Sequence, residues 1–474
     1  MVEPIIRASL LKKLMVPGTL LLFSPGAPSA GAATYYASPA GGGDGLRADS
    51  PFRIADFWGV AKPGDTLLLL DGTYRGRDAM INPPNNLNGE PGNPITVKAL
   101  HDGQVEIDGE GANTPVALTR NNHFVLEGFN AHGSMQSVVI LWYSSHNIIR
   151  RVCGWDAFDG NVNIFGARHG EHNLFEDCAG WGIARKVFSN SQQGNHTTFR
   201  RCWGRWEGSH CTGPKLVFAL SYNSYHALAE NCIGTWNAIG MRESYDLQDA
   251  SGKPLTGRSA AHYDHYEVRM PSGIFSHDAP DGDNSRVANA RLFGCIAYLR
   301  KGERFHSSYK WWIGPYNLSL PGIALTDCLS IIEPGGWDTI RNTQLGDPRE
   351  PGLNTAENLT LIGGKDVQIH PEWKTRGILV SRDGSELTAN GKHILDPSLN
   401  GSKGGATIMK RYVDGKLTDE DLWPWPMNQR IIDAMRRSGR EPVDVTKTVF
   451  EFCGGTPPPI GLAADGDGGH VPGK

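Results

Sequence analysis

The sequence predicts an all-β protein, a right-handed parallel β-helix in which short strands stack coil upon coil into a solenoid. A cysteine returns in a shared context at positions 153, 178, 202, 232, 295 and 328, mostly 24 to 33 residues apart. A repeat of that length, punctuated by Asn and Gly, is typical of solenoids. The apolar runs, such as VVILWY (138–143) and KLVFAL (215–220), are β-branched or aromatic and lack the 3.6-residue period of helical repeats.

The composition agrees with a folded, turn-rich protein. Of 474 residues, 39% are hydrophobic and 20% are charged, which excludes a disordered chain. The 59 glycines and 30 prolines favour many tight turns over long helices. The net charge of −4 and the lack of a long Lys/Arg run argue against a nucleic-acid partner.

The first 33 residues predict a signal peptide. Arg7, Lys12 and Lys13 precede an apolar run at 14–23, and small residues follow at 30–33. This order of basic, apolar and small segments is typical of secretory signals. No later segment reaches the roughly 20 apolar residues of a membrane-spanning helix. We therefore expect a secreted protein, extracellular or periplasmic, that does not span the membrane.

The repeat places the β-helix at residues 34–365. Beyond it we expect a C-terminal extension at 366–455 with one helix, at about 427–438, which Gly439 ends. The last residues, 456–474, are rich in Gly and Pro and are predicted to be a disordered tail.

In a β-helix equivalent residues of successive coils form ladders, so the recurring cysteines are expected to stack at one inward position. Buried cysteine packs as a small apolar residue. Parallel side chains suit the dihedral angle of a disulfide poorly, so we expect a reduced ladder. The alternative is that neighbouring cysteines of the ladder form disulfides. Cys211, which lies outside the pattern, is the best candidate for an exception, paired with Cys202 or Cys232.

The start of the solenoid resembles a known superfamily. KPGDTLLLLDGTY (62–74) and GNPITVKA (92–99) followed by VEIDG (105–109) resemble the first coils of the secreted pectate-lyase-like β-helix proteins, which include polysaccharide lyases and uncharacterised relatives. The resemblance covers roughly residues 34–365 and implies a short N-terminal capping helix, which would cover the exposed end of the solenoid. It implies the fold more strongly than the activity, because the same opening recurs in proteins of many chemistries.

Basic residues near the cysteine ladder could perform a β-elimination on a uronic acid polymer. That reaction must neutralise a carboxylate, remove the neighbouring C5 proton and protonate the leaving oxygen. The resemblance implies Lys or Arg, with a pKa lowered by neighbouring cations, as the base. Lys186 beside Arg185 is the preferred base, Lys215 is the substitute, and Arg205 is a possible carboxylate clamp or acid. The alternative is that these are solvated surface residues.

Acidic and amide side chains in the same coils are candidate calcium ligands. They are Asp156, Asp159, Asn161 and Glu207, whose oxygens are of the type that calcium prefers. Asp156, Asp159 and Glu207 could instead act as the paired carboxylates of a glycoside hydrolase. Asp159 and Asn161 also flank Gly160, so a simple turn explains them as well.

Substrate binding is assigned to Trp181, Trp206, His210 and Arg242. Flat aromatic faces stack on sugar rings, although many of the 13 tryptophans are expected to be buried between coils. The sequence therefore predicts a secreted protein that acts on polysaccharide, with a lyase favoured over a hydrolase or epimerase. The alternative is a non-catalytic carbohydrate-binding or structural protein, an adhesin or filament subunit, that self-associates through sheet edges.

Overall fold

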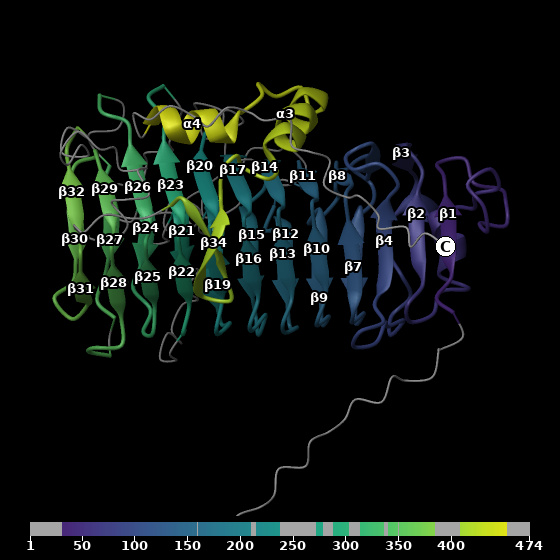
Figure 1. The fold of residues 1–474 in the computed structure, drawn as a ribbon, viewed down its shortest axis with the longest axis horizontal. Helices are drawn as coiled ribbons and strands as arrows, with labels where there is room; N and C mark the ends of the chain where they lie inside the picture. The colour runs from purple at the N-terminus through teal and green to yellow at the C-terminus, as the bar shows by residue number, and fades with distance from the viewer. Residues whose placement is uncertain are drawn as a thin grey trace, which may run out of the picture.

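A computed structural model describes residues 31–158, 160–209, 215–237, 272–277, 288–302, 313–335, 340–348, 350–383 and 408–452. These residues form a right-handed parallel β-helix, which confirms the predicted fold class (Figure 1). Residues 1–30 of the predicted signal peptide and the predicted tail lie outside this part of the chain.

Three parallel sheets run the length of the helix. Sheet A contains β1 (Thr34–Ala37), β2 (Thr66–Leu69), β4 (Ile95–Ala99), β7 (Phe124–Glu127), β10 (Ile148–Arg150), β13 (Leu174–Glu176), β16 (Thr198–Arg200), β19 (Leu228–Glu230), β22 (Arg291–Phe293), β25 (Ala324–Thr326), β28 (Thr355–Glu357) and β31 (Lys374–Arg376). Sheet B contains β3 (Gly72–Arg75), β5 (Val105–Asp108), β8 (Asn130–His132), β11 (Cys153–Trp155), β14 (Ala179–Ile183), β17 (Trp203–Gly208), β20 (Ile233–Trp236), β23 (Ile296–Leu299), β26 (Leu329–Ile332), β29 (Thr360–Ile362) and β32 (Leu379–Ser381). Sheet C contains β6 (Val116–Thr119), β9 (Val139–Trp142), β12 (Asn163–Arg168), β15 (Lys186–Ser191), β18 (Leu216–Tyr222), β21 (Ser272–His277), β24 (Ile313–Leu318), β27 (Thr343–Leu345) and β30 (Val367–Ile369).

The strands continue to Ser381, past the expected limit at residue 365. The repeat is hard to follow there because the cysteine position is taken by other apolar residues. The pairing of β26 with β29 and of β29 with β32 aligns Cys328 with Leu359 and then with Ile378.

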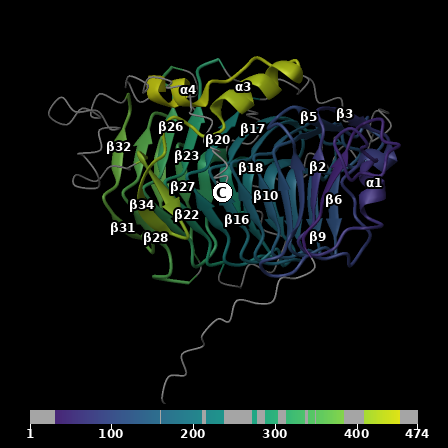
Figure 2. The ribbon, with the colours of Figure 1, turned by 45° about the vertical axis from the view of Figure 1, so that its right-hand side comes forward.

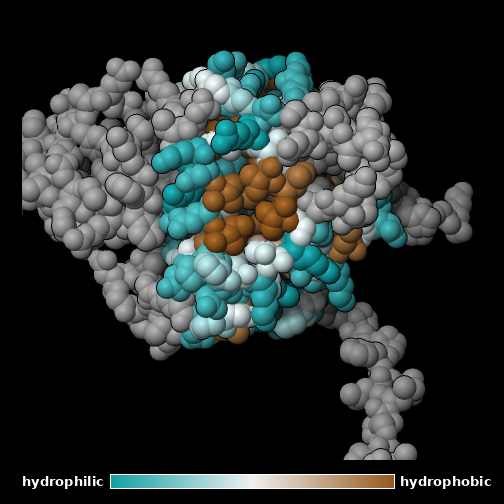
Figure 3. All heavy atoms as spheres, turned by 90° about the vertical axis from the view of Figure 1, so that its left-hand side faces the viewer, coloured by the Kyte–Doolittle hydropathy of each residue, from teal (hydrophilic) through white to brown (hydrophobic). Residues whose placement is uncertain are grey.

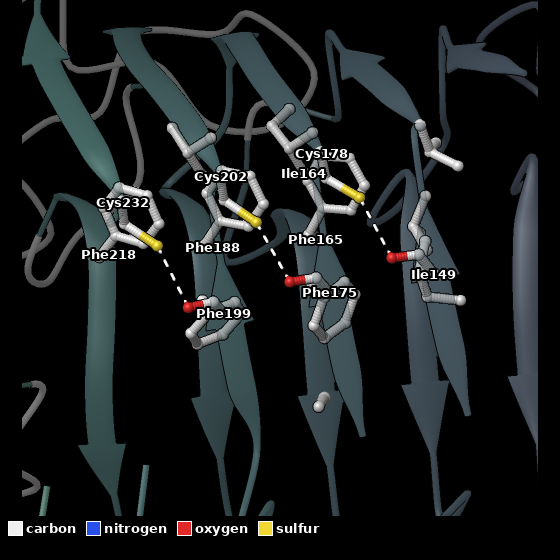
Figure 4. Close-up of a cluster of buried hydrophobic side chains, with 14 of the residues drawn as sticks. Ile149, Ile164, Phe165, Phe175, Cys178, Phe188, Phe199, Cys202, Phe218 and Cys232 are labelled. Carbon is white, nitrogen blue, oxygen red and sulfur yellow. Dashed lines mark hydrogen bonds between the residues drawn. The ribbon is translucent and has the colours of Figure 1, made fainter. Parts of the chain in front are cut away.

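The interior is held by ladders of like side chains. On the inner face of sheet C, Phe165, Phe188 and Phe218 stack with ring centroids 4.8 and 4.9 Å apart, and Phe275 continues the stack at 4.8 Å. Beside them the thiols of Cys178, Cys202 and Cys232 each donate to a backbone carbonyl of the preceding coil at 3.3 Å (Figure 4). Repeated contacts of this kind fix the register between coils.

Cys153 is a correction to the predicted ladder. Val152 occupies the inward position in its coil, and Cys153 pairs with Ala179 one residue later, on the outward side of sheet B. A shift of one residue turns a strand's side chains to the opposite face. In the coil of Cys178 the left-handed corner residue, Asp177, directly precedes the cysteine, whereas Val152 separates Arg151 from Cys153. The cysteines at 153, 178, 202, 232, 295 and 328 are all free, as expected of a reduced ladder.

The two ends of the helix differ. The N-terminal end is covered by α1 (Ile54–Phe57), the predicted cap, whose Ile54 and Phe57 are fully buried. A 3₁₀ turn (Arg77–Ala79) lies beside it. At the C-terminal end apolar side chains gather on the surface (Figure 3). In the last coil Val367, Ile369 and Ile378 are half-buried against the core and Val380 is 50% exposed.

The C-terminal extension packs on the outside of the helix. α3 (Asn428–Arg437) matches the predicted helix, and α4 (Val445–Phe452) was not predicted. Both helices lie over sheet B (Figure 2), where they bury its outward-facing Trp155, Trp181 and Trp203. A hairpin of β33 (Lys410–Val413) and β34 (Lys416–Asp421) precedes them. None of the described helices has the length and apolar character needed to cross a membrane.

Candidate functional site

Three basic residues lie at neighbouring positions of the corner between sheets B and C. Arg185 and Lys186 lie where β14 gives way to β15, and Lys215 directly precedes β18 in the next coil. The backbone N–H of Leu216 donates to the carbonyl of Arg185 at 3.2 Å, which places Lys215 next to Arg185. Arg185, Lys186 and Lys215 are only 9%, 4% and 3% exposed. The structure therefore brings together the predicted bases from consecutive coils.

Asn161 of the preceding coil contacts this basic corner. The amide oxygen of Asn161 accepts a hydrogen bond from Nη1 of Arg185 at 2.5 Å. A tight turn, in which the N–H of Gly160 donates to the carbonyl of Phe158 at 2.8 Å, precedes it. The Phe158 ring is 43% exposed, unusual for a large apolar side chain. Sequence reasoning did not select Phe158, although it lies in the same run, GWDAFDGNVN, as the selected Asp156 and Asn161.

Four further charged residues form a network between sheet B and the C-terminal extension. Arg205 donates from Nε to Oε1 of Glu207 at 2.8 Å, and Arg440 donates from Nε to Oε2 of Glu207 at 2.9 Å. Nη2 of Arg440 also donates to both oxygens of Asp156, at 2.8 and 3.0 Å. Burial would lower the pKa of Arg440, but the carboxylates of Asp156 and Glu207 raise it above its ordinary value. The network attaches the segment after α3 to the β-helix.

This pairing does not fit the predicted calcium site. Asp156, Asn161 and Glu207 each accept hydrogen bonds from an arginine, so their oxygens are directed at guanidinium groups. Asp156 also accepts from the N–H of Ile183 at 3.1 Å. Among the described residues no group of three or more His, Cys, Asp or Glu side chains is arranged to hold a metal ion. Asp159 lies outside the described residues.

The predicted substrate-binding tryptophans lie inside the protein. Trp181 is fully buried beneath the extension and donates from Nε1 to Oγ of Ser438 at 3.1 Å. Trp206 is fully buried, donates from Nε1 to the carbonyl of Ala184 at 2.8 Å and stacks on Trp236 at 4.2 Å. Neither indole presents a ring face to solvent, so both stabilise packing here. His210 and Arg242 lie outside the described residues.

The strands of sheet C begin at the basic corner, and their outward-facing residues extend from it. Lys186 and Ser189 lie on β15, in register with Asn163 and Gly166 of β12. A Cβ atom on Gly166 would lie 2.9 Å from Nδ2 of Asn163, so the side chain of Asn163 covers this outer face. Ser189 is fully buried, and its hydroxyl has no hydrogen-bond partner among the residues that the structure describes. Asn163, Lys186 and Ser189 on this side of the sheet are thus polar but buried.

No protein-family profile and no curated protein matches this chain. Among solved structures, pectate lyase Pel9A has a TM-score of 0.51 and 14% sequence identity, covering 82% of this chain and 91% of its own. An alginate lyase from Paenibacillus sp. has a TM-score of 0.42 and 13% sequence identity, covering 74% of this chain and 99% of its own. A rhamnogalacturonan lyase has a TM-score of 0.41 and 14% sequence identity, covering 86% of this chain and 99% of its own. At these identities the likeness shows the fold alone, and this chain has a pectate-lyase-like β-helix fold.

Proposed function

We propose that this protein cleaves a uronic-acid-containing polysaccharide by β-elimination at the basic corner formed by Arg185, Lys186 and Lys215. The observation that carries the proposal is that three basic residues lie at neighbouring positions of consecutive coils, with the exposed Phe158 in the coil before them. The proposed site of action is outside the cytoplasm, as the predicted signal peptide indicates.

The three cations match the three tasks of the reaction. Arg185 neutralises the uronate carboxylate, since a guanidinium binds a carboxylate through two parallel N–H groups. Lys186 is the base: as an uncharged amine it accepts the C5 proton, a role open to lysine but closed to the always-charged arginine. The electron pair left at C5 forms the C4–C5 double bond and expels the glycosidic oxygen at C4. Lys215 donates a proton to that oxygen.

The remaining predicted residues have structural roles in this proposal. Arg205 is bound to Glu207, so it is not assigned as clamp or acid. No step is assigned to calcium, because its predicted described ligands are engaged by arginines. Phe158 is assigned to sugar stacking, since an exposed aromatic ring offers a flat apolar face.

The roles are tested by kinetics on whichever acidic polymer the protein cleaves. Lys186→Met keeps most of the buried stem while removing the amine, and its rate should fall by about 10²- to 10⁴-fold. Lys374→Met is the control for loss of a lysine far from the corner, because Lys374 is exposed in the last coil, and it should retain full activity. Full activity of both Lys186→Met and Lys215→Met would overturn the assignment of the base and the acid.

A further inference from the structure

Two exposed aromatic rings lie at the corner between sheets C and A. Trp142 ends β9 and Tyr143 follows it; they are 43% and 48% exposed. Their ring centroids are 6.2 Å apart and their planes differ by 13°, so the two rings are nearly parallel. Single exposed apolar residues are common, but adjacent ones that form a patch often mark a binding site.

The backbone holds this arrangement. Tyr143 has φ 54°, the left-handed conformation, which redirects a side chain that would otherwise point opposite to that of Trp142. Its ring also stacks on His169 of the next coil at 4.5 Å and 9°. A left-handed non-glycine residue costs roughly 1–2 kcal/mol. Two later corners place Gln192 and Asn223 in this conformation, so the fold does not require a large aromatic residue here.

A cation completes the surface. The guanidinium carbon of Arg120 lies 5.8 Å from the centroid of the Tyr143 ring, a cation–π distance. Arg120 is exposed, and within the described part of the chain it has no carboxylate at salt-bridge distance. Thr119, the register partner of Trp142 in the preceding coil, is small and half-buried, so little side-chain bulk lies over the indole on that side.

We propose that Trp142, Tyr143 and Arg120 form a second glycan-binding site, here called the aromatic platform, whose ligand is a sugar bearing a carboxylate. The apolar C–H face of a pyranose stacks on the exposed indole of Trp142, beside the Tyr143 ring that Arg120 and His169 contact. The guanidinium of Arg120 pairs with the carboxylate of the same or the neighbouring sugar. The choice of an acidic glycan as the ligand rests on the proposed function. The assignment of the aromatic rings to sugar stacking is independent of that function.

The platform lies on the same coils as the basic corner. β12 runs from Asn163, the register partner of Lys186, to Arg168, the register partner of Trp142. Six extended residues span about 16 Å, the length of a short oligosaccharide. The basic corner and the platform therefore lie at opposite ends of the sheet C strands in the same coils.

Electrophoresis of the whole protein through native gels that contain polygalacturonate, alginate or neutral dextran tests the platform. Trp142→Ala should weaken retardation by acidic polymers about tenfold. Arg120→Gln should weaken it for the acidic polymers and leave any dextran effect unchanged. Leu353→Ala, which truncates a side chain 46% exposed outside the platform, is the control and should bind as wild type.

The outcomes separate the platform from the proposed reaction. Wild-type binding by Trp142→Ala, or no retardation of the wild type by any acidic polymer, overturns the platform. If retardation depends on Trp142 but no polymer is cleaved, the platform stands and the proposed reaction fails.

Discussion

Replacing Glu207 with glutamine tests whether the ion-pair network is the structural attachment of the C-terminal extension. The side chains of Glu207 and Arg205 are 1% and 5% exposed, and those of Arg440 and Asp156 are 24% and 34% exposed. Glu207→Gln keeps the shape and one carbonyl acceptor but removes the negative charge. Arg440 retains Asp156, whereas Arg205 is left buried without the counter-charge that it has in the wild type.

The expected cost follows from that difference. Removing one partner of a buried ion pair costs about 3–5 kcal/mol, and the remaining amide acceptor puts this case at the lower end, about 3 kcal/mol. For a domain of this size that is a fall in unfolding temperature on the order of 5 °C. Circular dichroism during thermal unfolding measures it.

Glu357→Gln is the matched control, because Glu357 pairs with Arg376 while their side chains are 37% and 75% exposed. An exposed pair of this kind should cost less than about 0.5 kcal/mol. An unfolding temperature for Glu207→Gln as high as that of the wild type would refute the structural reading of the network.

Three further predictions concern pH, thiols and calcium. Five histidines stack in successive coils with ring centroids 4.5–5.2 Å apart: His123, His146, His172, His196 and His226. Burial, and then the charges of the neighbouring imidazoles, lower the pKa of His146 and of His196, whereas the charge of Glu171 acts to raise both. A histidine whose pKa is lowered by folding contributes stability above its unfolded value of about 6.5 that is lost as the pH falls below it. The unfolding temperature should therefore drop between pH 7.5 and 5.5, and less so in His196→Ala; an equal drop in that variant would contradict this. Six of the eight cysteines are free and buried, and burial raises the pKa of Cys153 to about 11. A thiol reagent should therefore label at most two thiols in the native protein and further ones only after unfolding. Calcium should not raise the unfolding temperature through Asp156, since Arg440 engages both its oxygens; a rise that Asp156→Asn abolishes would contradict the ion-pair reading.

The fold was predictable because the coils of a β-helix produce a repeat of similar length in the sequence. Five coils carry an inward cysteine, at 178, 202, 232, 295 and 328, so equivalent positions could be aligned without knowledge of the structure. The misplacement of Cys153 arose because Val152 and Cys153 are both apolar, and only the left-handed corner at Arg151 decides which one faces inward.

The basic corner was predictable by the same alignment, since Arg185 and Lys215 occupy neighbouring coils. The partner of Glu207 was not, because Arg440 is 233 residues away and reaches it only through packing of the extension on sheet B. The same packing explains the tryptophans. Trp181 lies within a strand of sheet B, and Trp142 ends a strand of sheet C. Because α3 and α4 cover sheet B, Trp181 is buried, whereas Trp142 on sheet C stays exposed.

The measurement that tests the central claim most directly is the ultraviolet absorbance of an unsaturated uronate. The purified protein would be incubated with pectate, alginate, glycosaminoglycan, ulvan and gellan-type polymers, each with and without added calcium. The account predicts rising absorbance on at least one polymer, and no rise when Lys186→Met replaces the wild type. No rise on any polymer, with no reducing ends released, would contradict a lyase and favour a non-catalytic binding or structural protein.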